Sequence, residues 1–322
     1  MKLKRAIVTA VAPLRILIDG DTVAVPFTPE SLIDPATLAV DDVVRTELSG
    51  NRLVVLGRSG GLGLVSGRNL IINGNGAVNQ RGAASGTSLA LNAYFLDRWQ
   101  SVVASNAVTW TGDEQGRILT IPSGKAIATT LERRDVAAGS YVLSWTGTAS
   151  GSAVNVGGPE SSAASPVLVT LDGAANVFLR FTDGTLSNVK FERGSTPTPP
   201  DVRTYAESLA LCQRYYWRLS STGSALGIAT GVVQTSTKTH HSVLPFPTTM
   251  RASATMTVAA VNRTRVHQPG IAIDTTTALT ATVTVDAARI TATFLSASFV
   301  SAGAALLEWF GTTGWLAFDA EL

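Results

Sequence analysis

The chain has 322 residues, of which 45% are hydrophobic and only 15% are charged, and its formal net charge is +2. At about 150 residues per domain, this length predicts two or three domains. A charged share below the usual value of about 25% argues against long exposed helices, and the near-neutral charge argues against nucleic-acid binding through a basic field. We therefore expect an all-β protein that does not bind nucleic acid.

Membrane insertion and secretion signals are not expected either. No apolar stretch approaches the roughly 18 residues of a membrane-spanning helix. The basic start, Lys2 to Arg5, is followed by a short apolar run that stops at Pro13 without a convincing cleavage site, so we predict a strand there. Cys212 is the only cysteine, which excludes an intramolecular disulfide framework and a multi-cysteine zinc site.

The first segment, residues 1–58, has the spacing of a small β-barrel. Turn-forming residues such as Asp19-Gly20-Asp21 and Ser49-Gly50-Asn51 separate short apolar runs. Five strands in about 60 residues favour a five-stranded barrel. Residues 59–68 are rich in glycine and are expected to form a linker. The predicted strands are 6–11, 15–18, 22–27, 42–48 and 52–56.

The second segment, residues 69–194, continues with short strands and turns such as Asp172-Gly173 and Asp183-Gly184. This punctuation is typical of a β-sandwich or jelly roll. The predicted strands are 117–121, 125–131, 140–147, 166–171, 176–181 and 185–191.

Residues 195–219 combine a Pro-rich stretch, predicted to be extended and stiff, with a helix predicted over 201–219. Thr204 and Glu207 have the spacing of a capping box. Apolar residues at alternating spacings of three and four match the seam of a coiled coil, although a single amphipathic helix on a neighbouring sheet fits the same pattern. The seam residues are Val202, Tyr205, Leu209, Cys212, Tyr216 and Leu219.

The last segment, residues 220–322, is expected to be a β domain with strands at 254–261, 279–285 and 290–294. Leu279, Ala281 and Val283 alternate with threonines, which predicts one apolar face and one hydroxyl face. A charge-poor face of this kind pairs well against another copy of itself.

No credible catalytic or metal-binding set emerges. Gly57 to Gly61 matches G-x-S-x-G, but that motif needs a following helix, and here a Gly-rich linker follows. His240 and His241 are neighbours in a predicted strand, so they point to opposite faces and do not bind one metal together. Phosphate-loop, H-E-x-x-H and dinucleotide motifs are absent from the sequence. We expect no catalytic residue, no metal and no cofactor.

Two acidic groups keep an enzymatic alternative open. Asp113 and Glu132 lie near aromatic positions and are candidates for a pair of carboxylates that cleaves glycosidic bonds. Asp113-Glu114 most resembles a solvated turn. Asp97-Arg98-Trp99 is interpreted as structural, because a short charged entry to a strand is usually a buried ion pair under a core tryptophan.

Several stretches in chain order resemble bacteriophage tail fibres. Asn69 to Asn75, Gln80-Arg81-Gly82 and Asp97-Arg98-Trp99 are similar to the opening of the carbohydrate-binding-like jelly roll of these fibres. The exit of that module and the distal domain are also similar to this chain. The matching stretches there are Ser187 to Gly194, Tyr205-Ala206-Glu207, Leu211 to Tyr216, Phe246-Pro247 with Met250-Arg251, and Leu316 to Leu322.

The N-terminal segment resembles, by strand pattern, the small oligonucleotide/oligosaccharide-binding-fold (OB-like) barrels by which phage baseplate proteins attach. The resemblance implies a homotrimer in the virion's distal tail, with the barrel docked on tail-tip proteins and the trimeric C-terminal domain facing the bacterium. It implies host adsorption through surface glycans and no enzymatic activity. The alternatives are a purely structural baseplate adaptor and a polysaccharide depolymerase.

Aromatic and polar residues supply the candidate glycan contacts under this hypothesis. Aromatic rings stack on the apolar faces of sugars while neighbouring polar groups bind the hydroxyls. At the distal tip the candidates are Trp309 and Trp315 for stacking and His240 or His241 for hydrogen bonding. In the sandwich the candidates are Trp110 and Asn106.

Overall fold

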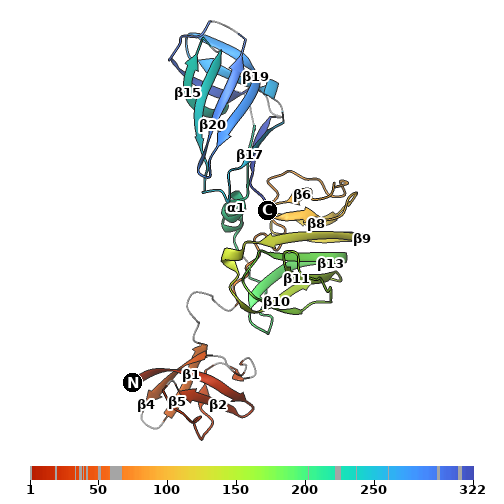
Figure 1. Ribbon diagram of the computed structural model, residues 1–322, viewed down its shortest axis with the longest axis vertical. Coiled ribbons are helices and arrows are strands. Elements are labelled where there is room, and N and C mark those ends of the chain that lie inside the picture. Colours follow the sequence, from red (N-terminus) through yellow and green to blue (C-terminus); the bar gives the residue numbers. More distant parts are fainter. Residues whose placement is uncertain are drawn as a thin grey trace. The chain divides into compact units, whose positions relative to one another are not determined.

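A computed structural model describes residues 2–18, 20–32, 34–35, 38, 40, 43–49, 52–58, 67–201, 203–221, 226–236, 238–259, 261–295, 298–310 and 314–322. The chain forms two compact units, Met1–Arg68 and Asn69–Leu322. Strands make up most of both units (Figure 1), which confirms the all-β prediction. Residues 59–66 of the predicted linker, with Ser59 of the G-x-S-x-G match, lie outside the described residues.

The first unit is a five-stranded sheet in the order β2-β1-β4-β5-β3. Neighbouring strands are antiparallel except for β3, which runs parallel to β5. Ala6, Val8, Ile16, Val44 and Val55 are fully buried and form its core. The strands are β1 (Lys2–Val11), β2 (Leu14–Ile18), β3 (Glu30–Ser31), β4 (Val43–Ser49) and β5 (Arg52–Arg58).

The strand predicted at 22–27 does not form. These residues are bends, and only the Val25 amide reaches a neighbouring strand, donating to the Ile16 carbonyl at 2.9 Å. Pro26 has no amide hydrogen to continue that ladder, which explains why the apolar pattern of this stretch does not become a strand.

The first portion of the second unit, residues 69–194, is called the sandwich below after the prediction for it. It is an eight-stranded sheet system in the order β12-β10-β13-β9-β7-β6, in which β11 also pairs with β13 and β8 with β9. Two strands are longer than predicted, since β9 and β13 each join two predicted strands. The pairing of β9 with β13 shifts register between Thr182 and Gly184 of β13. The strands are β6 (Tyr94–Leu96), β7 (Trp99–Ser101), β8 (Thr109–Asp113), β9 (Gly116–Leu131), β10 (Gly139–Thr146), β11 (Ser150–Asn155), β12 (Val167–Leu171) and β13 (Val177–Arg193), with a short 3-10 helix at Arg133–Asp135.

A large aromatic cluster holds the sandwich together. Trp99, Tyr141, Phe181 and Phe191 are at most 1% exposed. The Tyr141 and Phe191 rings stack at 5.0 Å between centroids, and Trp145 meets Phe181 edge to face at 5.2 Å. Buried aromatic pairs of this kind stabilise a fold beyond their area alone, which makes this cluster the main core of the second unit.

Helix α1 (Tyr205–Gln213) is shorter than predicted. It begins at the predicted capping box, in which the Glu207 amide donates to the Thr204 hydroxyl and the Glu207 carboxylate accepts from the Thr204 amide. It ends six residues before Leu219, because the chain enters strand β14 (Tyr216–Ser220), whose partner is β22. Consecutive aromatic residues at 215–217 favour a strand, and pairing across the sheet overrides the helical spacing.

The rest of the second unit consists of a three-stranded sheet, β14-β22-β17, and a closed six-stranded barrel, β15-β16-β20-β19-β18-β21. As predicted, Leu279, Ala281 and Val283 pack against the barrel core while Thr280 and Thr282 face solvent. The elements are β15 (Leu226–Gln234), β16 (Thr239–Pro245), β17 (Thr255–Val258), a 3-10 helix (Val261–Arg263), β18 (Thr264–Gln268), β19 (Ala272–Val283), β20 (Ala287–Phe294), β21 (Ala304–Trp309) and β22 (Trp315–Asp319).

Candidate functional site

The residues predicted for glycan binding at the distal tip do not form one surface. Trp309 is 2% exposed and His240 is 0% exposed, so both belong to the barrel interior and neither can meet a glycan. Trp315 is half-buried under the Arg218 guanidinium, which lies 4.7 Å from its ring centroid. His241 is half-buried and bonds to the hydroxyls of Thr239 and Thr291, at 3.2 and 3.1 Å.

The sandwich candidates are also structural. Asn106 is fully buried, and its amide donates to the Ser101 hydroxyl and to the Ala126 carbonyl. Trp110 is half-buried and stacks on Phe95 with 6.0 Å between ring centroids. A buried amide that holds two strands together offers no group to a sugar, so the prediction for Asn106 is wrong.

The predicted seam does not lie on one helix face. Cys212 is fully buried and Tyr216 is 6% exposed within the single chain, so neither is available to a partner. Tyr205 is 40% exposed, Leu209 is half-buried, and Leu219 lies on β14 rather than on the helix. Val202 lies outside the described residues. At Cys212 and Tyr216, the apolar spacing therefore reflects packing inside a single chain and not contact with a partner chain.

The two candidate carboxylates have separate structural tasks. Asp113 is exposed and accepts a hydrogen bond from the Gln115 amide, which closes the turn between β8 and β9. Glu132 accepts from the Tyr215 hydroxyl at 2.6 Å. Burial disfavours its charged form, but this hydrogen bond and the charges of Arg214 and Arg134 outweigh burial and lower the pKa of Glu132. A carboxyl with a lowered pKa is a poor general acid.

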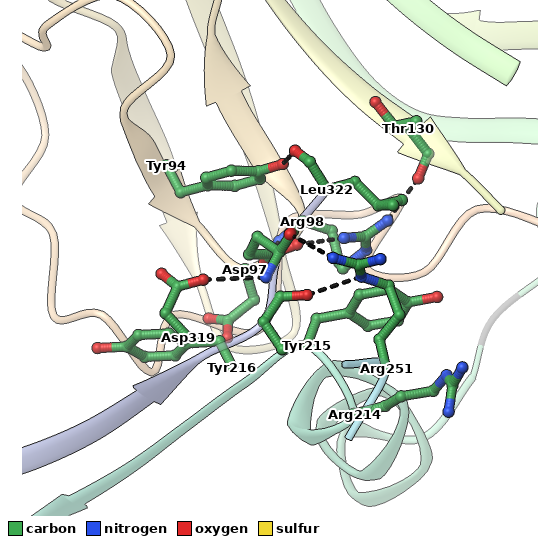
Figure 2. A network of polar contacts seen from close by, with 12 residues as sticks. Tyr94, Asp97, Arg98, Thr130, Arg214, Tyr215, Tyr216, Arg251, Asp319 and Leu322 are labelled. Atoms are coloured by element: carbon green, nitrogen blue, oxygen red, sulfur yellow. Dashed lines mark hydrogen bonds and ion pairs between the residues drawn. The ribbon is translucent and has the colours of Figure 1, made fainter. Parts of the chain in front are cut away.

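A buried ionic network joins the sandwich to the end of the chain (Figure 2). Arg98 and Glu321 form an ion pair in which both side chains are 3% exposed. Arg81 pairs with the same carboxylate at 3.3 Å and with Asp319 at 2.9 Å. Arg98 also donates to the Thr130 carbonyl. Because the carboxylates come from the end of β22 and the residues after it, while the guanidinium groups come from the sandwich, the network fixes one portion on the other.

Backbone groups at the chain end are held in the same way. The Tyr94 hydroxyl donates to the Leu322 carbonyl at 2.8 Å, and Arg251 donates to the carbonyls of Ala320 and Glu321, each at 2.8 Å. Figure 2 shows Tyr94, Arg98 and Arg251 converging on this end of the chain, and Figure 1 places the terminus beside β6. We call this set, together with Arg81, Asp97, Asp319 and Glu321, the junction network.

Asp97 is the carboxylic acid of the junction network whose charged form is disfavoured by burial. It is fully buried, and its carboxylate accepts from the Gln80 amide at 2.6 Å and from the Gln80 side chain at 2.7 Å. Burial outweighs these bonds and raises the pKa of Asp97 to about 6. With Arg98 and Trp99 also buried, the prediction of a structural Asp97-Arg98-Trp99 entry is confirmed, although Arg98 pairs with Glu321 rather than with Asp97.

A polar hollow lies where four segments distant in sequence meet. The segments are the opening loop, the turn between β8 and β9 at Gln115, strand β13, and the residues that lead into α1. We call it the amide hollow. It is lined by Asn69, Ile71, Asn73, Gly74, Asn75, Gln115, Asn188, Val189, Lys190, Pro200, Asp201, Arg203 and Ser208.

The walls of the amide hollow are fixed by buried hydrogen bonds. Asn69 donates to the Val189 carbonyl at 2.8 Å and accepts from the amides of Ile71 and Phe191, each at 3.0 Å. A side chain at Gly74 would place its Cβ 2.2 Å from the Val189 carbonyl oxygen, so only glycine lets the loop approach β13 this closely. The hollow is therefore preformed.

The stretch after β13 is pinned to the sandwich rather than left as a spacer. Lys190 and Glu192 form a buried pair at 3.3 Å. Lys190 donates to the Pro199 carbonyl at 2.8 Å, and Glu192 accepts from the amide and hydroxyl of Thr198, each at 2.7 Å. The Pro-rich composition predicted a stiff chain. The two residues that hold it in place, Lys190 and Glu192, belong to no recognisable sequence motif and were not predicted to do so.

Comparisons with known proteins add little. No family model matches the sequence, and no curated protein matches it. Among solved structures, the chain is similar to YhhW from Escherichia coli, with 9% identity over 71% of this chain and 87% of that one, and a TM-score of 0.16. A likeness at this level carries no argument about fold or function.

Within the described residues, no helix has the length and apolarity to cross a membrane. Among the same described residues, no three or more His, Cys, Asp or Glu side chains are grouped so that they could hold a metal ion.

Proposed function

We propose that this protein is a non-enzymatic receptor-binding protein of a bacteriophage tail tip, which attaches the virion to glycans on the bacterial surface. One observation carries the proposal. Stretches that resemble tail fibres, from three regions of the chain about 100 residues or more apart, meet in or beside the junction network: Gln80-Arg81 with Asp97-Arg98, Tyr215-Tyr216, and the end of the chain. Residues that share one structural task explain why the matches occur together and in order.

Each part of the chain has its own role in this proposal. The five-stranded N-terminal unit acts as an OB-like attachment barrel that docks on the baseplate or tail tip, and the sandwich is the jelly roll. The distal barrel assembles as a homotrimer through its outer face. Val232 and Val243, at 50% and 61% exposed, and the outward Thr280 and Thr282 support the idea, with the exposed Arg289 of β20 between Val243 and Thr282.

Avidity would give the trimer its hold on a cell. Three weak glycan sites at short separation bind far more tightly together than one site alone. The test uses the purified full chain, fluorescently labelled, with a panel of bacterial cells and isolated cell-wall glycans, and light scattering for its mass. We expect a trimer mass and saturable binding to at least one strain. A monomer that binds neither cells nor glycans contradicts the proposal.

The second candidate, a structural adaptor, is favoured by the burial of Trp309 and His240, which removes the predicted distal glycan contacts. An adaptor would bind tail proteins and ignore cells, whereas a receptor-binding protein does both. Binding of the labelled chain to purified phage tails lacking this protein, compared with its binding to cells, separates the two. The depolymerase alternative predicts new reducing ends from host polysaccharide, and we expect none.

A further inference from the structure

The amide hollow contains polar groups that the fold itself does not use. Gln115 and Asn188 are exposed, and within the described part of the chain neither side-chain amide makes a hydrogen bond. Asn75 also lines the hollow, but its side chain is engaged, since its nitrogen donates to the Gln115 carbonyl and its oxygen accepts from the Ala77 amide, each at 3.3 Å. Ser208 borders the hollow from helix α1. The unused groups are therefore amides and a hydroxyl, each able to donate and accept.

The backbone is distorted where it presents Asn188. The pairing of β10 with β13 shifts register so that Ser144 faces Lys190 and Thr146 faces Ser187, which leaves two residues of β13 opposite one of β10. Asn188 has a φ of 50°, in the left-handed region. Such a bulge re-aims a side chain and is frequent beside binding sites. Here it leaves Asn188 out of the regular pairing with β10, at a position that lines the hollow.

The charged groups of the hollow are already engaged. The Lys190 ammonium bonds to Thr198 and to the Pro199 carbonyl. The Arg203 guanidinium donates to the carbonyls of Asn69 and Ile71. The Asp201 carboxylate accepts from the Asn69 amide at 3.2 Å. An anionic ligand would have to displace these contacts, so the hollow favours an uncharged ligand.

We propose that the amide hollow binds one uncharged sugar residue of a glycan, with Gln115 and Asn188 as the hydrogen-bonding side chains. A hexose presents several neighbouring hydroxyls, each a donor and an acceptor, and these complement amide side chains. The preformed walls reduce the ordering cost of binding. The choice of a glycan rests on the proposed function, while the neutral and amide-bonded character of the ligand rests on the hollow.

The test is a titration followed by saturation-transfer NMR on the full chain with D-glucose, D-galactose, N-acetyl-D-glucosamine and D-galacturonate. We expect binding of at least one neutral sugar and weaker or no binding of the acid. Asn188→Gly removes the amide and tolerates the left-handed backbone, and we expect it to weaken binding about tenfold. Gln115→Ala is expected to act in the same direction.

Asn92→Gly is the matched control, because Asn92 is also exposed with a φ of 60° and lies away from the hollow. The inference is overturned if no neutral sugar binds, if galacturonate binds best, or if Asn188→Gly and Gln115→Ala bind like Asn92→Gly. Cell binding by the same samples separates the two proposals. Cell binding without sugar binding in the hollow removes this inference alone, and sugar binding without cell binding removes only the proposed function.

Discussion

The junction network and the distal barrel bury polar groups in opposite ways. At the junction, charged side chains are buried and compensated, with Arg98 and Arg81 against Glu321. In the barrel interior, the buried polar residues are neutral, namely His240, Ser242, Thr264, Gln268 and Thr276. Glu308 is also buried, but it lies on the outer side of β21 beside Arg265, at 2.6 Å.

This difference has a physical consequence for specificity and strength. A buried ion pair costs desolvation but fixes geometry, because each buried charge must meet an opposite charge. Neutral polar groups cost less and constrain less. The junction is therefore expected to define one arrangement of sandwich and β22, while the barrel depends on its apolar interior of Phe294, Leu307 and Trp309.

The largest effect should follow from breaking the junction. Glu321→Gln leaves Arg98 buried without a counter-charge and takes one from Arg81. Removal of one partner from a buried pair destabilises a protein by about 3–5 kcal/mol. Urea unfolding of the full chain measures this. The control is Glu160→Gln, whose partner Arg180 is 35% exposed, and there we expect about 0–1 kcal/mol. Equal losses in the two variants would refute the special role of the junction.

The second effect concerns pH. Because the pKa of Asp97 is raised from 3.8 to about 6, the folded state holds this proton more tightly than the unfolded state does. Its contribution to stability is complete below pH 3.8 and is lost as the pH rises through 6, a change of about 3 kcal/mol. The unfolding free energy of the protein minus that of Asp97→Asn, followed over this range, should fall with rising pH. A flat difference would show that Asp97 is not strained.

A smaller effect is expected inside the barrel. The hydroxyls of Thr264 and Thr276 bond to each other in the interior. Thr276→Val leaves one buried hydroxyl without this partner, which costs about 1–3 kcal/mol, whereas replacing both threonines by valine should cost clearly less than the single change. Thermal unfolding of the single and double variants tests this. A double variant that loses more than the single one would contradict the view of the barrel as tolerant of neutral repacking.

The smallest effect is acid sensitivity of the barrel. Burial lowers the pKa of His240, and its Nδ1 has no partner among the described residues, while Nε2 bonds to the Ala305 carbonyl at 3.2 Å. The unfolded state therefore takes up the proton first, and stability falls as the pH drops below 6.5, opposite in sign to Asp97. The Nε2 bond persists on protonation, which limits the size. The difference in unfolding free energy between the protein and His240→Gln should shrink with acid; growth of that difference would contradict the assignment.

Local patterns predicted part of this fold well. The β class, the alternation at 279–283 and the capping box at Thr204 all depend on neighbours in sequence, and all are present. The helix end was wrong because strand pairing with β22, about 100 residues away, decides the conformation of Tyr216. A prediction from neighbouring residues cannot include a strand partner so far along the chain.

The candidate site was harder for the same reason. Trp309 and His240 were chosen for their chemistry, but a closed barrel turns alternate residues inward, and closure is not visible in one strand. The amide hollow is built from residues 69–75, Gln115, and residues 188–190 and 200–208, whose proximity depends on the whole sandwich. Asn73 and Asn188 both have left-handed backbones in the structure. Because asparagine tolerates this conformation better than most residues, these two asparagines are the local sequence signal that could have drawn attention to the hollow.

The pairing of Ser220 with Trp315 means that the chain leaves for the barrel and returns from it at directly opposed residues. Insertions whose two ends lie this close can be exchanged with little disturbance to their host. A chimera that keeps residues 203–220 and 315–322 would retain Glu321, Asp319 and every sandwich partner of the junction. It would lose Arg251, the edge strand β17 and the ring of Phe246, which packs on Trp217 and Phe318. The barrel can thus be treated as an exchangeable domain on a retained base.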